Sequence, residues 1–164
     1  MKEITGNLWD FHGYHNTVIC LTTNGTVKAN GEGVMGRGNA LEATQRFPGI
    51  AAKLGDRLMH RGNHVEWLFV GVLMFPVKHQ WFERADLELI ARSVQELQRF
   101  IEANPRLIWI LPRPGVGNGK LDWKDVKPLL EKLPDSVYVI TFEKQEASNG
   151  SNKENSDTDG LATG

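Results

Sequence analysis

Lys78 is the side chain of this sequence with the clearest route to covalent chemistry. It lies in residues 75–81, FPVKHQW, where an apolar run typical of a strand ends in a lysine, a histidine and a tryptophan. A lysine at a strand end can pair with a ligand's negative charge, or act as an amine nucleophile when burial lowers its pKa. Most lysines are instead solvated surface charges. The segment alone leaves these interpretations open.

A glycine-rich stretch ahead of a predicted helix is the second candidate. Residues 31–39 read GEGVMGRGN and lead into a helix expected to start near Asn39. Glycines let a ligand approach the backbone N–H groups, and a helix N-terminus adds partial positive charge, so the stretch favours a phosphate or diphosphate. It matches neither a P-loop nor a dinucleotide-binding fingerprint. The alternative is a flexible, glycine-rich entry to a helix.

A second glycine-rich segment follows a later predicted strand. Residues 111–123 read LPRPGVGNGKLDW and again precede a helix. In open α/β sheets ligands bind beyond the carboxyl ends of strands, so two such loops can clamp one phosphorylated ligand from both sides. The alternative is an ordinary strand-to-helix turn in which Asp122 is the N-cap and Trp123 packs beneath it.

Metal binding and base stacking by core tryptophans are not predicted. The histidines without regular ligand spacing to one another or to Cys20 are His12, His15, His60 and His64. The tryptophans in strand-like segments, expected in the core, are Trp9, Trp67 and Trp109.

The length and composition predict one domain whose net charge is too small to attract a polyanion by itself. The chain has 164 residues, 40% of them apolar, and a net charge of -1, so a phosphate ligand would be held mainly by backbone groups. A lone cysteine, Cys20, suits a reducing compartment. No signal peptide or membrane span is evident. We expect a cytoplasmic monomer without a membrane partner.

The predicted elements alternate between strands and helices, which indicates an α/β fold with a sheet between helical layers. Strands are expected over residues 2–7, 16–22, 65–76, 106–112 and 136–142, and helices from residue 39 and over 50–59, 85–103 and 123–133. Residues 65–76 are a nearly continuous apolar run and are predicted to be one central strand. Residues 23–39 are predicted to be one long loop, and residues 143–164 a disordered polar tail.

Four of these segments together resemble the macro domain superfamily, and more narrowly the branch of the DNA ADP-ribosyl glycohydrolase antitoxins and the terminal ADP-ribose protein glycohydrolases. The matching segments are Gly6-Asn7-Leu8, GVMGRGNAL at 33–41, FPVKHQW at 75–81 and LPRPGVGNGKLDW at 111–123. They occur in the family's order. The resemblance implies a macro domain over residues 1–142, a mixed sheet sandwiched between helices, with ADP-ribose in a cleft at one end.

The resemblance also implies roles for individual residues. Asn7 stands where an aspartate commonly holds the adenine end, and Lys78 matches the lysine that this branch uses to break the bond between ribose and the modified group. The first glycine-rich loop would lie against the distal ribose and the diphosphate, and the second would cover the diphosphate. The implied ligand-binding residues are Asn7, Thr23, Asn24, Gly33, Val34, Met35, Gly36, Gly38, Asn39, Gly115, Val116, Gly117, Asn118 and Gly119. No cofactor and no metal are implied.

Two departures from the family pattern bear on the substrate. Gly119 stands where the protein-directed members carry an acidic residue, so the sequence is more similar to the DNA-directed antitoxins. A covalent adduct on Lys78 would therefore lack a carboxylate to help resolve it. The insertion at residues 22–32, TTNGTVKANGE, is longer than usual and is expected to rim the cleft and set substrate choice.

The leading hypothesis is a hydrolase that releases ADP-ribose from a nucleic-acid base or a protein side chain. Its partner would be ADP-ribose or an ADP-ribosylated macromolecule, single-stranded DNA being one candidate. The alternatives are a non-catalytic reader of ADP-ribose, a phosphatase acting on ADP-ribose 1''-phosphate, and an unrelated nucleotide-binding module.

Overall fold

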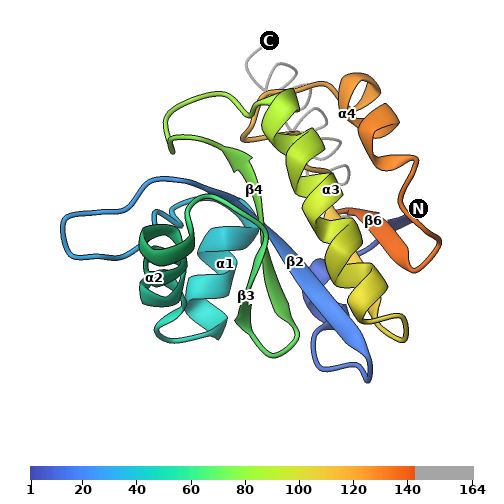
Figure 1. Cartoon of the computed structure of the whole chain (residues 1–164), viewed down its shortest axis with the longest axis horizontal. Coiled ribbons are helices and arrows are strands. Elements are labelled where there is room, and N and C mark those ends of the chain that lie inside the picture. The colour runs from blue at the N-terminus through green and yellow to red at the C-terminus, as the bar shows by residue number, and fades with distance from the viewer. Residues whose placement is uncertain (143–164) are drawn as a thin grey trace, which may run out of the picture.

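A six-stranded mixed sheet forms the centre of the computed structural model, which describes residues 1–142 (Figure 1). Its strands are β1 (Lys2–Thr5), β2 (Thr17–Asn24), β3 (Glu66–Phe69), β4 (Val72–Lys78), β5 (Ile108–Pro112) and β6 (Val137–Thr141). They lie in the order β1-β6-β5-β2-β4-β3. All neighbouring pairs are parallel except β3 with β4, which is antiparallel. The predicted α/β fold with a mixed sheet is confirmed.

Helices cover both faces of the sheet, as the alternating pattern predicts. The helices are α1 (Gly38–Arg46), α2 (Ile50–Arg61), α3 (Leu87–Ala103), α4 (Trp123–Leu130) and the short 3-10 helix η1 (Leu8–Phe11). One apolar cluster joins buried residues of α1, α2 and η1 to one face of the sheet, and a second joins α3 and α4 to the other face. Within residues 1–142, no helix has the length and apolar character to cross a bilayer.

The prediction of a single strand over residues 65–76 is wrong, because this run is a hairpin. β3 ends at Phe69, Val70 is fully exposed at the turn, and Gly71 has a φ of 80°, which glycine adopts without strain. The chain then reverses into β4. An apolar residue at the turn left the hydrophobic pattern unbroken, so only Gly71 marked the reversal in the sequence.

Other boundaries differ by a few residues. Thr23 and Asn24 end β2, and the first predicted strand stops at Thr5. Trp9 lies in η1, not in a strand, although it is buried as expected. The break at Pro48-Gly49 is confirmed, since α1 ends at Arg46 and α2 begins at Ile50. The predicted tail, residues 143–164, lies outside the described residues.

The sheet topology gathers the candidate segments at one edge. β1, β2, β4, β5 and β6 run parallel, so their carboxyl ends meet at the same edge of the sheet. The loops after β2 and β4 leave the same end of the sheet in Figure 1. A ligand site of an open α/β sheet is expected at such an edge.

Candidate functional site

The loop after β2 begins with a compact turn. Val27 and Gly33 form an antiparallel bridge, and Lys28 N–H donates to the Glu32 carbonyl over 2.7 Å. The Asn24 side chain braces this turn, because its Nδ2 donates to the Val34 carbonyl and its Oδ1 accepts from Thr26 N–H, both over 3.0 Å. The inserted residues 22–32 therefore form a hydrogen-bonded turn beside the first glycine-rich loop.

Gly33 lets this loop lie directly on α2. A Cβ added at Gly33 would lie 2.6 Å from Leu54 Cγ, and Gly33 N–H donates to the Ala51 carbonyl over 2.8 Å. The absence of a side chain at Gly33 thus allows the backbone of the first loop to pack closely against α2. Because Gly33 N–H is occupied, this residue contributes shape to the site and not a free donor.

The exposed part of the first loop is Gly36, Arg37 and Gly38, at the N-terminus of α1. Arg37 is the N-cap and gives no side-chain cap bond. Within residues 1–142, no backbone acceptor is found for the N–H groups of residues 36–39. Unpaired donors at a helix N-terminus form a site for a phosphate or carboxylate.

The second glycine-rich loop connects β5 to α4 and is packed tightly at two of its glycines. Gly115 has a φ of 75°, and a Cβ there would lie 2.8 Å from Ile90 Cδ1 and 2.9 Å from Ala85 Cβ. A Cβ at Gly119 would lie 2.3 Å from the Gly115 carbonyl oxygen. This loop conformation therefore has no room for a side chain at residue 119.

The tip of the second loop is open and touches the first loop. Gly117 and Asn118 are exposed, and Gly117 has a φ of 81°. A Cβ at Gly38 would lie 3.0 Å from Asn118 Nδ2, so the two loops are in contact. The prediction that two glycine-rich loops lie together is thus consistent with the geometry.

Lys78 lies at the end of β4, beside a break in the strand register. Pro76 pairs with Thr23 and Lys78 pairs with Asn24, so Val77 is an extra residue on β4. Such a bulge redirects the following side chain. Lys78 is half-buried, and its Nζ donates to the Trp81 carbonyl over 3.3 Å.

One cation from each glycine-rich loop acts on Lys78, the last residue of β4. The pKa of Lys78 is lowered by burial first, and then by repulsion from Arg37 in the first glycine-rich loop and Lys120 in the second. Positive charge gathered beside unpaired backbone N–H groups attracts an anion. Neither Arg37 nor Lys120 was predicted from the sequence, where the only signal was a basic residue within each glycine-rich loop.

Two other predicted site residues, Asn7 and Thr23, lie on other strands or loops than Lys78. Asn7 lies at the end of β1, and its Oδ1 accepts from Trp9 N–H over 3.0 Å, which caps η1. Four strand spacings of about 4.8 Å separate β1 from β4, roughly 19 Å in all, so one ligand reaching Asn7 and Lys78 must be elongated. Thr23 is 4% exposed, and its Oγ1 has no partner within residues 1–142.

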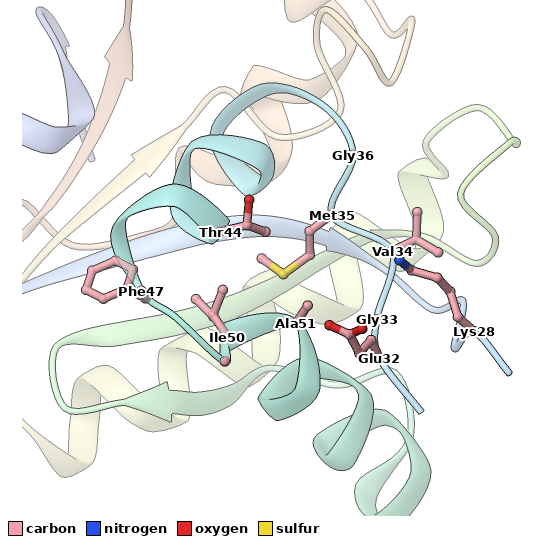
Figure 2. A pocket seen from close by; sticks show the side chains of 11 residues that line it. Lys28, Glu32, Gly33, Val34, Met35, Gly36, Thr44, Phe47, Ile50 and Ala51 are labelled. Atoms are coloured by element: carbon pink, nitrogen blue, oxygen red, sulfur yellow. The ribbon is translucent and has the colours of Figure 1, made fainter. Parts of the chain in front are cut away.

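A pocket of about 310 Å³ adjoins the first loop on its α1–α2 side (Figure 2). Figure 2 shows the Met35 side chain directed toward Ile50 and Ala51, with Phe47 at one end and Lys28 at the other. The pocket is lined by Lys28, Glu32, Gly33, Val34, Met35, Gly36, Thr44, Phe47, Gly49, Ile50 and Ala51. It does not include Lys78 or the second loop. The residues of α1 and α2 that line this pocket were not predicted from the sequence, since only the glycine-rich side carried a signal.

Asp122 and His79 are two other polar residues next to these loops. Asp122 occupies the N-cap position of α4, as predicted, but makes no side-chain cap bond; its carbonyl accepts from Asp125 N–H over 3.0 Å. His79 Nε2 contacts Asp86 Oδ2 over 2.7 Å. Across residues 1–142, no cluster of three or more histidine, cysteine or acidic side chains is arranged to hold a metal ion.

Comparison with known proteins identifies the fold family. No family model matches the chain. A "DNA ADP-ribosyl glycohydrolase" of Mycobacterium tuberculosis is 32% identical over 140 residues, covering 76% of this chain. The chain spans only 36% of the length of that relative.

Solved structures with the same fold include two from this group. The macrodomain of Mycobacterium tuberculosis DarG has a TM-score of 0.68 and 25% identity, covering 86% of this chain and 95% of that one. Thermosipho africanus DarTG in complex with ADP-ribose has a TM-score of 0.65 and 21% identity, covering 85% of this chain and 41% of that one. The chain belongs to the macro domain superfamily, in the branch that contains the DarG macrodomains.

Proposed function

We propose that this protein binds ADP-ribose and hydrolyses ADP-ribosyl groups from a larger molecule. The observation that carries the proposal is that the exposed tips of both glycine-rich loops touch at the sheet edge where β4 ends in Lys78. The similarity to a DNA ADP-ribosyl glycohydrolase and to a structure containing ADP-ribose supports both halves of the proposal.

The ligand would lie along the carboxyl edge of the sheet. Its diphosphate would be held by the N–H groups of Gly36 and Gly38 at the start of α1, with the tip of the second loop, Gly117 and Asn118, on its other side. Asn7 would lie at the adenine end. The distance of roughly 19 Å along the sheet fits an extended dinucleotide-like ligand.

The other predicted residues would shape this site. Thr23 would shape the site at the carboxyl end of β2, where its buried hydroxyl has no partner among residues 1–142. Asn24 and Gly33 hold the first loop in place through the contacts described above. The remaining predicted contacts, Val34, Met35, Asn39, Gly115, Val116 and Gly119, would form the walls of the loops.

Lys78 would act at the anomeric carbon of the distal ribose. As an amine, its Nζ lone pair forms a bond to that carbon while the bond to the modified group breaks and the leaving group takes up a proton. Water then attacks the same carbon, and the lysine is released. As a cation, Lys78 would instead stabilise the charge on the departing group while water attacks directly. Its lowered pKa favours the amine.

The substrate favoured by the second loop is ADP-ribosylated single-stranded DNA. Gly119 carries no carboxylate, and the 2.3 Å approach to the Gly115 carbonyl leaves no space for one. The acid-assisted chemistry of the protein-directed members is therefore unsupported by this loop. We retain the monomeric state and the cytoplasmic location as predictions.

The test incubates the protein with ADP-ribosylated single-stranded DNA and with ADP-ribosylated protein in parallel, and measures free ADP-ribose. We expect release from the DNA, and a loss of roughly 100-fold or more in kcat for Lys78→Ala. Lys78→Arg keeps a cation without a nucleophile, so it separates the two roles. Unchanged turnover in Lys78→Ala would refute the assignment.

A non-catalytic reader is the second candidate function, and the absence of a carboxylate at Gly119 favours it. Calorimetric binding of ADP-ribose without release from either substrate would establish it. Phosphate release from ADP-ribose 1''-phosphate would instead establish a phosphatase.

A further inference from the structure

An exposed aromatic pair lies in the loop between β4 and α3. The Trp81 and Phe82 side chains are 49% and 70% exposed, and their rings meet edge to face with centroids 5.8 Å apart. The predicted core tryptophans are buried or half-buried, so this pair differs from them. Two aromatic rings left in solvent form an apolar surface that is typical of a binding site.

The backbone of this pair is fixed beside Lys78. Trp81 N–H donates to Thr26 Oγ1 over 2.9 Å, and the Trp81 carbonyl accepts from Lys78 Nζ over 3.3 Å. Thr26 Oγ1 in turn donates to Gln80 Oε1 over 2.7 Å. The insertion after β2 thus anchors the loop, and the backbone of Trp81 lies next to the predicted reaction centre.

Gly25 allows this anchoring. A Cβ at Gly25 would lie 2.6 Å from the His79 carbonyl oxygen and 2.9 Å from Asn63 Nδ2. Asn63 Nδ2 also donates to the Lys78 carbonyl over 3.0 Å. The loops after β2 and β4 therefore lie in direct contact, and neither can swing away without breaking these bonds.

The charge around the pair suits a polyanion. Arg84 lies in the same loop and donates to the Lys120 carbonyl over 2.8 Å, which ties the aromatic loop to the second glycine-rich loop. Arg37 and Lys120 add positive charge that acts on Lys78. Of the two carboxylates in the loop, Asp86 is engaged by His79 and by the start of α3, and Glu83 is exposed.

We propose that Trp81 and Phe82 form a stacking platform for a nucleobase next to the ADP-ribosylated nucleotide of a single-stranded nucleic acid, with Arg84 on the flanking phosphate. Aromatic rings stack on any base, and basic side chains follow the backbone, which is how single strands are held without sequence readout. The inference rests on the proposed function and specifies the substrate class of that site.

The first test compares two substrates that share one scissile bond, an ADP-ribosylated single-stranded oligonucleotide and the ADP-ribosylated nucleoside. In the variant Trp81→Ala/Phe82→Ala, we expect KM for the oligonucleotide to rise roughly 5- to 100-fold, with kcat unchanged. Turnover of the nucleoside and calorimetric binding of ADP-ribose stay as in the wild type. Trp81→Phe/Phe82→Tyr restores KM. An equal loss on both substrates would overturn the inference.

The control is Tyr14→Ala, which removes an aromatic side chain that is 62% exposed and precedes β2 at the amino edge of the sheet. This variant is expected to leave KM for the oligonucleotide and KM for the nucleoside unchanged. The anchoring of Trp81 uses only its backbone groups, so the alanine variants keep the loop bonds.

A second test separates this inference from the proposed hydrolysis. Fluorescence anisotropy of a labelled, unmodified single-stranded oligonucleotide needs no turnover, and the double alanine variant is expected to weaken its binding while Tyr14→Ala binds it normally. That result supports the platform even if no ADP-ribose is released from any substrate. Unchanged oligonucleotide binding, or an equal loss of activity on ADP-ribosylated protein, would refute the platform and leave the proposed hydrolysis standing.

Discussion

Placing a side chain at Gly119 should destabilise the fold. An aspartate there should therefore not provide a carboxylate that assists Lys78. The Cβ of Gly119→Ala would lie 2.3 Å from the Gly115 carbonyl oxygen and 2.7 Å from Gly115 Cα. Gly119 cannot move away easily, because its carbonyl accepts from Ala85 N–H over 3.0 Å. Gly115 is held equally firmly, since its carbonyl accepts from Leu121 N–H over 3.0 Å.

The magnitude follows from the contacts that must change. Overpacking costs about 1–3 kcal/mol. Stretching the two hydrogen bonds adds about 1 kcal/mol in total if each loses roughly half its value. The free energy of unfolding should fall by about 2–4 kcal/mol, which corresponds to a decrease in Tm of roughly 4–16 °C for a domain of this size.

The assay is thermal unfolding of Gly119→Ala and Gly119→Asp, with calorimetric binding of ADP-ribose on whatever stays folded. The matched control is Gly36→Ala, an exposed loop glycine where an added Cβ meets nothing within 4 Å and where φ lies outside the left-handed region. It should melt within about 1 °C of the wild type. If Gly119→Asp kept the wild-type Tm and cleaved ADP-ribosylated protein, the steric account of this position would be wrong.

Further predictions concern charge and reactivity. If Lys78 acts as an amine, the acid limb of the kcat/KM profile reports its lowered pKa, so Arg37→Gln, which removes a repelling cation, should shift that limb to higher pH. Arg37→Gln and Lys120→Gln should each weaken ADP-ribose binding about 2- to 10-fold in calorimetry at low salt, and less at high salt; an effect independent of salt would contradict direct charge attraction. Burial raises the pKa of the Cys20 thiol, so the native protein should resist alkylation by iodoacetamide, whereas the unfolded protein should react fully.

The placement of the candidate segments at one edge of the sheet could be predicted because it depends on local order along the chain. Each glycine-rich segment lies between a strand and a helix, and parallel strands bring such connections to one edge. Lys78 ends a strand in the same way. These relations need only the identity of the elements, which the hydrophobic pattern supplied at every strand except the hairpin of β3 and β4.

The details of the site could not be predicted, because they arise from contacts between segments far apart in sequence. Nothing in the local sequence brings Arg37 and Lys120 toward Lys78. Composition counts Trp81 as an apolar residue suited to the core, yet its loop is held away from the core by Thr26, which is 55 positions earlier. The sequence shows that residue 119 is a glycine, but only the loop geometry shows that a side chain there would clash with the Gly115 carbonyl.

The arrangement is also compatible with the proposed selection of a dianionic ligand by a chain with a net charge of -1. Its attraction is local, since three cations converge on one sheet edge and repel one another when no anion is bound. An anionic ligand would relieve that repulsion and would also raise the pKa of Lys78, which works against an amine nucleophile. The two demands are compatible if backbone N–H groups at the start of α1 carry most of the diphosphate charge. Glycines at positions 36 and 38 would thus keep Lys78 reactive as well as letting the ligand approach.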